Sequence, residues 1–281
     1  MTAASDAQTL TAGKKPARPW LIEKSMTDPL FARLCVAGLA LGLWELAGQT
    51  IFDRDFISPP SAIIAAMPRV LSDPAILWAL AITFYELVTA FIIALIGGLL
   101  IGIPVGLHGF TTRSTLPLIL LAYSIPQVTI LPLFVLWFGV ETASKIAFGV
   151  SHGIFPVILN VIAGAQTVEA AHLTAARSMG ATRMQILRRV ILPHMTPSLF
   201  AGLRLGMSAT LLGVLLAELY VSTGGIGYYT KLFSESFDPP ATFALVVCMA
   251  FMAVLLNEIV RRAERRASFW RTQDTGSPPS R

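Results

Sequence analysis

Long apolar runs dominate the pattern of hydrophobic and polar positions, and most of them are long enough to cross a lipid bilayer. A transmembrane α-helix needs about 20 consecutive, mostly apolar residues. Six such runs predict transmembrane helices over residues 31–52, 78–107, 114–140, 146–168, 194–217 and 241–260. The chain is therefore expected to be an all-α, polytopic membrane protein with six transmembrane helices.

Prolines and glycines mark the segments between these runs. Residues 51–75 hold four prolines and predict a loop with one surface helix near 61–71. The uncharged third run carries Pro117, Pro126 and Pro132, which are expected to bend it. A Gly-rich loop is expected between the last two runs. The Gly98-xxx-Gly102-xxx-Gly106 spacing favours close packing between helix backbones.

The predicted organisation is one membrane domain with two tails. Residues 1–30 are polar and predict a cytosolic tail, residues 31–270 a single transmembrane domain, and residues 271–281 a C-terminal tail. The first apolar run begins too late for a cleaved secretory signal.

Composition supports lipid as the solvent and excludes several kinds of site. Of the 281 residues, 54% are apolar and 13% are charged, against about 25% charged in soluble chains. The two cysteines lie in apolar runs and the four histidines lack metal-ligand spacing, so neither a metal nor a cofactor is expected. The phosphate-binding pattern G-x-x-x-x-G-K-[ST] is absent, so any driving nucleotide must bind another chain.

The distribution of Lys and Arg predicts the orientation. With both termini inside, the inner segments hold 16 basic residues and the outer loops hold 4. Basic residues are enriched on the cytoplasmic side of membrane proteins. Both tails and the segment 169–193 are therefore expected in the cytosol, and the basic excess needs no nucleic-acid partner.

The segment 169–193, between the fourth and fifth runs, predicts two short helices joined at Gly180. Glycine tolerates the backbone angles of a sharp bend, and Pro193 marks a break before the next run. Apolar Met184, Leu187 and Ile191 recur at helical spacing, with arginines on the other faces. Such a hairpin is suited to docking into a groove on a soluble partner.

This segment resembles the cytoplasmic coupling loop of binding-protein-dependent ABC importer permeases. The family signature runs E-A-A, three residues, Gly, nine residues, Ile, one residue, Leu-Pro. Its counterparts here, together with the nearby Arg183, are Thr174, Ala175, Ala176, Gly180, Val190, Leu192 and Pro193. Thr174 replaces the glutamate and is expected to act as a helix cap. A literal Glu169-Ala170-Ala171 lies out of register.

Shorter matches extend the resemblance over residues 75–270, within the nitrate, sulfonate and taurine group. They include Leu131 to Gly139, Ser144-Lys145, Ala217-Glu218 and Gly224 to Tyr228. The resemblance implies a non-catalytic permease in the bacterial inner membrane. It also implies an ABC ATP-binding subunit, a periplasmic or lipid-anchored solute-binding protein and a permease homodimer surrounded by membrane lipid.

Five polar side chains within the apolar runs are candidates for the substrate path: Glu86, Tyr123, Gln127, Asn160 and Arg204. An ionised group in hydrocarbon costs about 2.5–3.5 kcal/mol, so each charged one must face protein or water. Arg204 is expected to pair with Glu45, Glu86 or Glu258, or else to line the path. The three uncharged side chains suit either hydrogen bonds between helices or contact with the solute.

The transported solute and one other mechanism remain open at this stage. A carboxylate such as Glu86 suits a pyrimidine or riboflavin-type vitamin precursor better than nitrate, a sulfonate or taurine, yet a paired Glu86 would permit either. The alternative mechanism is a proton-coupled secondary transporter in which Glu45, Glu86 and Glu258 relay protons. A membrane hydrolase is disfavoured because the H-E-x-x-H motif is absent.

Overall fold

A computed structural model describes residues 29–51 and 56–267, and all regular structure within these ranges is helical. Five described helices are long and apolar enough to cross a membrane. They are α2 (Pro29–Thr50), α4 (Pro74–Leu107), α7 (Thr142–Gln166), α10 (Leu192–Val221) and α12 (Pro239–Ala267). A bent pair, α5 (Gly109–Ser124) with η1 (Gln127–Ile130) and α6 (Leu131–Phe138), supplies a sixth candidate span. The all-helical prediction with six candidate spans is confirmed.

The chain divides into two units at Pro60. In the first unit, α2 has 22 residues and so is about 33 Å long, enough for a hydrocarbon core of about 30 Å. The predicted N-terminal tail falls almost wholly outside the described residues, and the C-terminal tail falls entirely outside them. The surface helix expected near 61–71 is present as α3 (Pro60–Ser72).

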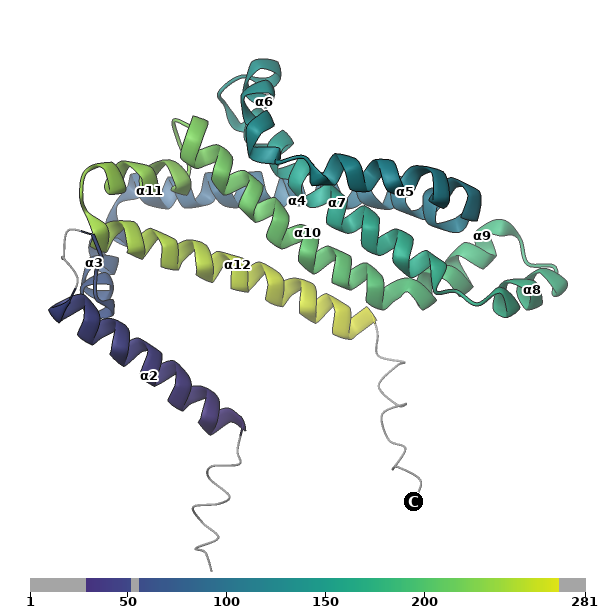
Figure 1. The fold of residues 1–281 in the computed structure, drawn as a ribbon, viewed down its shortest axis with the longest axis horizontal. Coiled ribbons are helices and arrows are strands. Elements are labelled where there is room, and N and C mark those ends of the chain that lie inside the picture. Colours follow the sequence, from purple (N-terminus) through teal and green to yellow (C-terminus); the bar gives the residue numbers. More distant parts are fainter. Residues whose placement is uncertain (1–28, 52–55, 268–281) are drawn as a thin grey trace, which may run out of the picture. The chain divides into compact units, whose positions relative to one another are not determined.

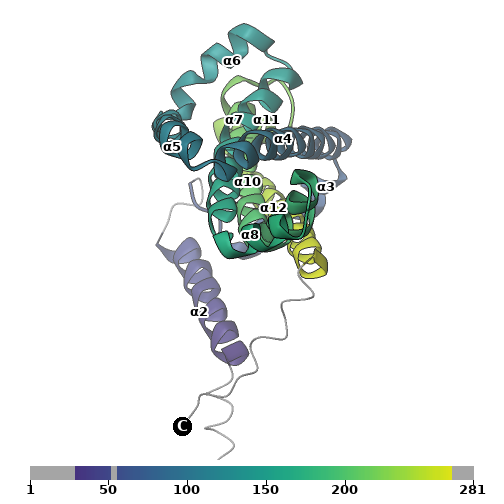
Figure 2. The same ribbon diagram turned by 90° about the vertical axis from the view of Figure 1, so that its right-hand side faces the viewer.

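In the second unit, α7 packs between α4 and α10, as the two views in Figures 1 and 2 show. Three glycines of α4 make the first of these contacts close. A Cβ atom added to Gly102 would lie 2.7 Å from Val161 Cγ1, and one added to Gly98 would lie 2.4 Å from Val157 Cγ1. The glycine spacing therefore serves helix packing, as the sequence predicts.

The third apolar run is broken rather than merely curved. Its two parts meet at an angle of 77°. Pro126 has no N–H group, and its ring disfavours helical angles at Ile125, which adopts an extended conformation with φ −67° and ψ 129°. Figure 2 shows α6 at the edge of the helix bundle.

A second difference lies in the stretch expected to be a Gly-rich loop. Ser222 to Gly225 do form a turn, but a ten-residue helix, α11 (Ile226–Glu235), follows. Its buried Ile226, Gly227 and Thr230 lie on one face, and it packs on α10 and α12. The sequence signal for this helix was weak, because the segment is not apolar enough for a membrane span and contains glycine.

Candidate functional site

The segment 169–193 forms the predicted helical hairpin. Its first arm is α8 (Ala170–Ser178), and its second arm is α9 (Arg183–Ile186) followed by the π-helical turn η2 (Leu187–Ile191). Gly180 has a φ of +77°, a conformation that L side chains rarely adopt. The Gly180 N–H donates to Arg177 O at 2.9 Å, and the Ala181 N–H donates to Ala176 O at 3.1 Å. These two bonds are the Schellman pattern that ends a helix at glycine.

The second arm begins with a reciprocal cap. The Thr182 side chain accepts a hydrogen bond from the Gln185 N–H at 3.3 Å, and the Gln185 side chain accepts one from the Thr182 N–H at 2.8 Å. Two backbone donors that the helix leaves without partners are thereby satisfied. The sequence did not single out this cap, although the spacing Thr-x-x-Gln carries the signal.

The expectation that Thr174 caps a helix is wrong. Thr174 lies inside α8 and its hydroxyl donates to Ala170 O at 2.9 Å, while Glu169 occupies the N-cap position. The literal Glu169-Ala170-Ala171 therefore starts the arm, and the aligned Thr174-Ala175-Ala176 follows one turn later. Thr174 and Ala175 are exposed, whereas Ala176 is buried.

One side of the hairpin packs against the transmembrane helices. Ala176, Ile186 and Ile191 are buried in a cluster that also holds Val161 of α7 and Met195 of α10. Ile103 of α4 and the half-buried Val190 and Leu192 pack against this cluster. The hairpin is therefore fixed to the three central helices by apolar contacts.

The exposed side chains of the hairpin are apolar near its tip and include four arginines. Met179 is 80% exposed and Met184 is 55% exposed. The exposed arginines of the hairpin are Arg177, Arg183, Arg188 and Arg189. Exposed apolar side chains ringed by charge are typical of a protein-docking surface.

The second arm continues directly into α10. Residues 183–221 form one uninterrupted helical segment of 39 residues, which corresponds to about 58 Å measured along the helix. Pro193 cannot donate the hydrogen bond of a regular helix, and the π-helical turn that precedes it accommodates this loss without ending the segment. A displacement of the hairpin can therefore be transmitted along α10.

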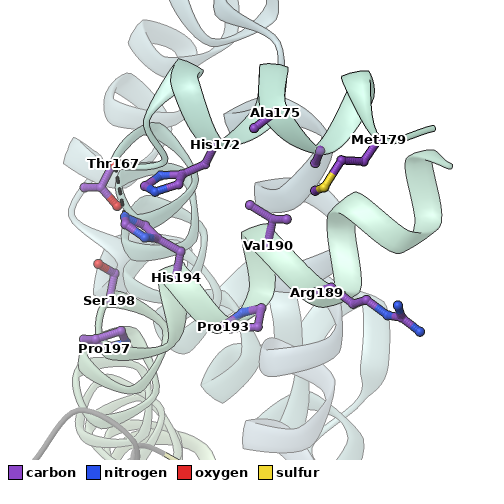
Figure 3. Close-up of a pocket in the computed structure, with 11 residues that line it drawn as sticks. Thr167, His172, Ala175, Met179, Arg189, Val190, Pro193, His194, Pro197 and Ser198 are labelled. Atoms are coloured by element: carbon purple, nitrogen blue, oxygen red, sulfur yellow. Dashed lines mark hydrogen bonds between the residues drawn. The ribbon is translucent and has the colours of Figure 1, made fainter. Parts of the chain in front are cut away.

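A cleft of about 860 Å³ opens between α8 and the first turns of α10. Figure 3 shows the imidazole rings of His172 and His194 next to each other in this cleft. Their centroids lie 6.4 Å apart and the ring planes are tilted by 45°. His194 Nε2 lies 3.0 Å from Thr167 O, which holds that ring in place. Val190 and Pro193 also line the cleft.

At the far end of α10, four polar side chains form a buried polar cluster: Thr83, Glu86, Lys145 and Glu218. Lys145 Nζ lies 2.6 Å from Glu86 Oε1 and donates to Gly224 O at 3.3 Å. Each of these side chains is at most 5% exposed. The ion pair links α4 to the start of α7, and each charge offsets part of the cost of burying the other.

The other half of the buried polar cluster holds the turn before α11. The Thr83 hydroxyl lies 2.6 Å from Glu218 Oε1 and accepts a hydrogen bond from the Ile226 N–H at 2.9 Å. Glu218 Oε2 accepts one from the Gly227 N–H at 2.8 Å. Three short sequence matches, Ser144-Lys145, Ala217-Glu218 and Gly224 to Tyr228, thus meet in space. Sequence alone did not identify Lys145 as the partner of Glu86, although a glutamate within an apolar run needs a partner of opposite charge.

The remaining candidate path residues each contact a different partner. The Tyr123 ring stacks on Phe155 with centroids 5.5 Å apart, and Gln127 Oε1 accepts a hydrogen bond from Ser151 at 3.1 Å. Asn160 donates to Pro156 O at 2.9 Å. Arg204 pairs with Glu264 at 2.7 Å rather than with any of the three glutamates expected.

The comparisons with known proteins agree on one family. The family model described as "Binding-protein-dependent transport system inner membrane component" matches residues 94–268. The taurine transport system permease protein TauC of Escherichia coli is 30% identical over 233 residues, which cover 81% of this chain and 84% of that relative. The putative aliphatic sulfonates transport permease protein SsuC of Bacillus subtilis is 28% identical over 247 residues, 86% and 88% of the two chains.

A more distant relative and a solved structure extend these likenesses. The formylaminopyrimidine transport permease protein ThiX of Halalkalibacterium halodurans is 25% identical over 229 residues, covering 82% of this chain and 91% of that relative. Among solved structures, the inward-facing MetNI methionine ABC transporter matches with a TM-score of 0.58 and 19% identity. It covers 69% of this chain and 99% of the matched chain, so the likeness extends to the fold.

Proposed function

Because this chain belongs to the family of binding-protein-dependent transport system inner membrane components, we propose that its hairpin (residues 169–193) receives the ATPase of the transporter. The chain is the inner-membrane permease of an ABC importer. It is a non-catalytic subunit whose ATPase is a separate chain, and its partners are an ATP-binding subunit and a solute-binding protein. The family to which the chain belongs favours ATP-driven import over the proton-coupled secondary transport considered from sequence.

The observation that carries the proposal is the continuity of the hairpin with α10. The tip beside Gly180 offers two exposed methionines and flanking arginines, including Arg183, to a soluble partner. Thr174 and Ala175 add a small exposed surface on the first arm. On the inner side, Ala176, Val190 and the Leu192-Pro193 start of α10 transmit force to the bundle.

In the proposed cycle, ATP binding draws two ATPase subunits together and the docked hairpins follow. Each hairpin then moves its α10 helix, and the permease switches from an inward-facing to an outward-facing state. Nucleotide and loaded binding protein act by stabilising different states, so the two states need to differ by only a few kcal/mol.

We further propose that the path lies between two copies of this chain, next to the break between α5 and α6. Non-helical backbone is not tolerated against lipid and occurs at membrane depth only where protein or a water-filled cavity covers it. Tyr123, Ser124, Ile125 and Pro126 are all exposed in the single chain. A second copy and the cavity between the copies supply the required cover, and they place Tyr123 and Gln127 beside the solute.

The other candidates take different positions in this proposal. Asn160 lies on α7 opposite Gly202 of α10, where a Cβ atom on the glycine would come within 2.7 Å of Asn160 Cβ. It can respond to movement of α10. Arg204 is held by Glu264, and Glu86 by Lys145. We propose that these two charged side chains shape the path indirectly, because Arg204 helps to position α10 and Glu86 helps to position α4.

The relatives point to two classes of solute, a sulfonate such as taurine or a heterocyclic vitamin precursor. Because Glu86 is paired with Lys145, its negative charge does not repel an anionic solute, and a sulfonate is compatible with the permease. Both classes of solute are small molecules.

The test is co-purification of the tagged permease from its native membrane, followed by identification of its partners. An ATP-binding subunit and a solute-binding protein are expected, and crosslinking should recover permease dimers. Ligand binding to the recovered receptor, measured with taurine and riboflavin, then separates the two solute classes. Recovery of the permease alone from gently solubilised membranes would contradict the proposed assembly.

A further inference from the structure

A second cavity lies on the other side of the hairpin, where it faces the turn between α4 and α5. Its volume is about 490 Å³. The residues that line it are Leu107, His108, Leu173, Arg177, Arg183, Met184, Ile186, Leu187 and Ile191. Figure 1 shows the α4–α5 turn beside the hairpin that carries α8 and α9.

Two arginines from different arms of the hairpin share this cavity. Arg177 comes from the last turn of α8, and Arg183 is the first residue of α9. Across the described residues, neither guanidinium has an ion-pair partner, whereas Arg204 and Lys145 each have a carboxylate. No acidic residue is among the described side chains that line the cavity. The cavity therefore presents two positive charges that no carboxylate among the described residues neutralises.

Most of the remaining lining is apolar, from leucine, isoleucine and methionine side chains. A bare phosphate ion would gain nothing from these groups. The volume also exceeds what such an ion needs, since a water molecule occupies about 30 Å³ in the liquid and the cavity holds roughly sixteen times that. The chemistry of the lining is that of a molecule with an anionic head and a hydrocarbon tail.

The position of the cavity supports the same class of ligand. Leu107 ends α4, a 34-residue helix that is about 51 Å long and so exceeds a hydrocarbon core of about 30 Å. This length allows the Leu107 end to lie at the level of the lipid headgroups. In the proposed orientation this is the cytoplasmic side, where anionic lipids meet basic pockets between helices.

We propose that this cavity binds one anionic phospholipid of the inner leaflet. Arg177 and Arg183 hold the phosphate from the two sides of the Gly180 bend, and guanidinium groups bind phosphate through paired N–H donors. Leu107, Leu173 and Leu187 contact the first carbons of the acyl chains. The lipid thus stabilises the angle between the two arms of the hairpin.

The test measures lipid retention on the full-length permease by native mass spectrometry. The probes are phosphatidylglycerol, phosphatidylcholine with the same acyl chains, and inorganic phosphate. The wild-type chain is expected to retain phosphatidylglycerol and to release it no faster when inorganic phosphate is added. Two basic side chains near a membrane surface strengthen binding about 30-fold together, so Arg177→Gln with Arg183→Gln should weaken retention by about that factor.

A matched control removes two other exposed arginines, Arg188→Gln with Arg265→Gln, and should leave retention unchanged. Equal retention of both phospholipids by the wild-type chain, displacement by inorganic phosphate, or an equal loss in the control would overturn the proposal. If the test variant does not fold, photoactivatable phosphatidylglycerol on the wild-type chain decides the matter. Labelling within residues 107–108 or 173–191 supports the site, and labelling elsewhere alone refutes it.

This site rests on the proposed cytoplasmic position of the hairpin, and its Arg183 and Met184 also belong to the surface proposed to meet the ATPase. The lipid assay is performed without the ATPase. Failure of lipid binding therefore leaves the proposed coupling role intact, and loss of coupling does not affect the lipid assay.

Discussion

At the residue scale, Gly180 determines the bend of the hairpin. A Cβ atom at this position would meet no heavy atom within 4 Å, so the obstacle to substitution is the positive φ rather than lack of space. Left-handed backbone costs most residues about 1–2 kcal/mol, and asparagine tolerates it better. Conformation alone is thus expected to rank the variants at this position.

We predict that Gly180→Val uncouples ATP hydrolysis from uptake while the chain still inserts into the membrane. Gly180→Asn is the matched control and should remain close to wild type. The measurement is the number of ATP molecules hydrolysed per solute imported by proteoliposomes. An unchanged ratio for the valine variant would argue against a coupling role for the bend.

The Glu86–Lys145 pair gives a second prediction, because both charges are buried. Removing one partner leaves the other charge uncompensated, which typically costs about 3–5 kcal/mol. Glu86→Gln should therefore lower the thermal unfolding temperature of the purified permease strongly. The double variant with Lys145→Met should recover most of the loss, whereas equal unfolding temperatures for single and double variants would refute the pairing.

Uptake by the double variant also tests the path assignment of Glu86. If Glu86 contributes only by holding α4 against α7, the double variant should transport with an unchanged KM once its stability is restored. A raised KM would indicate direct contact with the solute.

Sequence alone identified residues whose role depends on their neighbours in the chain. It missed residues whose partners lie far away in the sequence. The bend at Gly180 follows from the backbone preference of a single residue, so the sequence predicted the hairpin. The break expected at Pro193 is absent, because the helix continues through this residue into α10. The partner of Arg204 is Glu264, 60 positions away, and nothing local distinguishes it from the other glutamates. The role of Thr174 was misassigned because the N-cap of α8 is Glu169, five residues earlier.

At the element scale, α4 packs closely against α7 because Gly98, Gly102 and Gly106 of α4 have no side chains where the two helices meet. We predict that Gly102→Ala destabilises the permease by about 1–3 kcal/mol, because the new Cβ atom would lie 2.7 Å from Val161 Cγ1. Gly109→Ala, at the start of α5, meets no atom within 4 Å and serves as the control. Thermal unfolding in detergent should separate the two variants, and equal values would contradict the packing account.

Element lengths and boundaries were predictable where hydropathy decides them. Continuous apolar runs located most of the long helices to within about five residues, although α12 ends at Ala267, seven residues after the predicted end at 260. The prolines of the third run predicted a bend. Its size was not predictable, because the 77° angle depends on where α6 packs against α7. The short helix α11 was missed since tertiary contacts with α10 and α12, rather than a long apolar run, stabilise it.

At the scale of the whole molecule, the exposed break between α5 and α6 predicts a permease dimer. Mass photometry of the gently solubilised importer should give two permease copies for every two ATP-binding subunits. A photocrosslinker at Tyr123, which is 43% exposed, should join two permease chains, whereas one at Trp78, 70% exposed on α4, should not. A crosslink from Trp78 alone would place the dimer contact elsewhere.

Transmission from the hairpin to the opposite end of α10 is the central claim, and contact between the hairpin and the ATPase is its first step. The most direct test is a photocrosslinking residue at Met179, 80% exposed on the tip, in the assembled importer. The matched control is Tyr220, 67% exposed near the far end of α10. We predict a crosslink to the ATP-binding subunit from Met179 and none from Tyr220. Crosslinks to that subunit from Tyr220 but not from Met179 would contradict it.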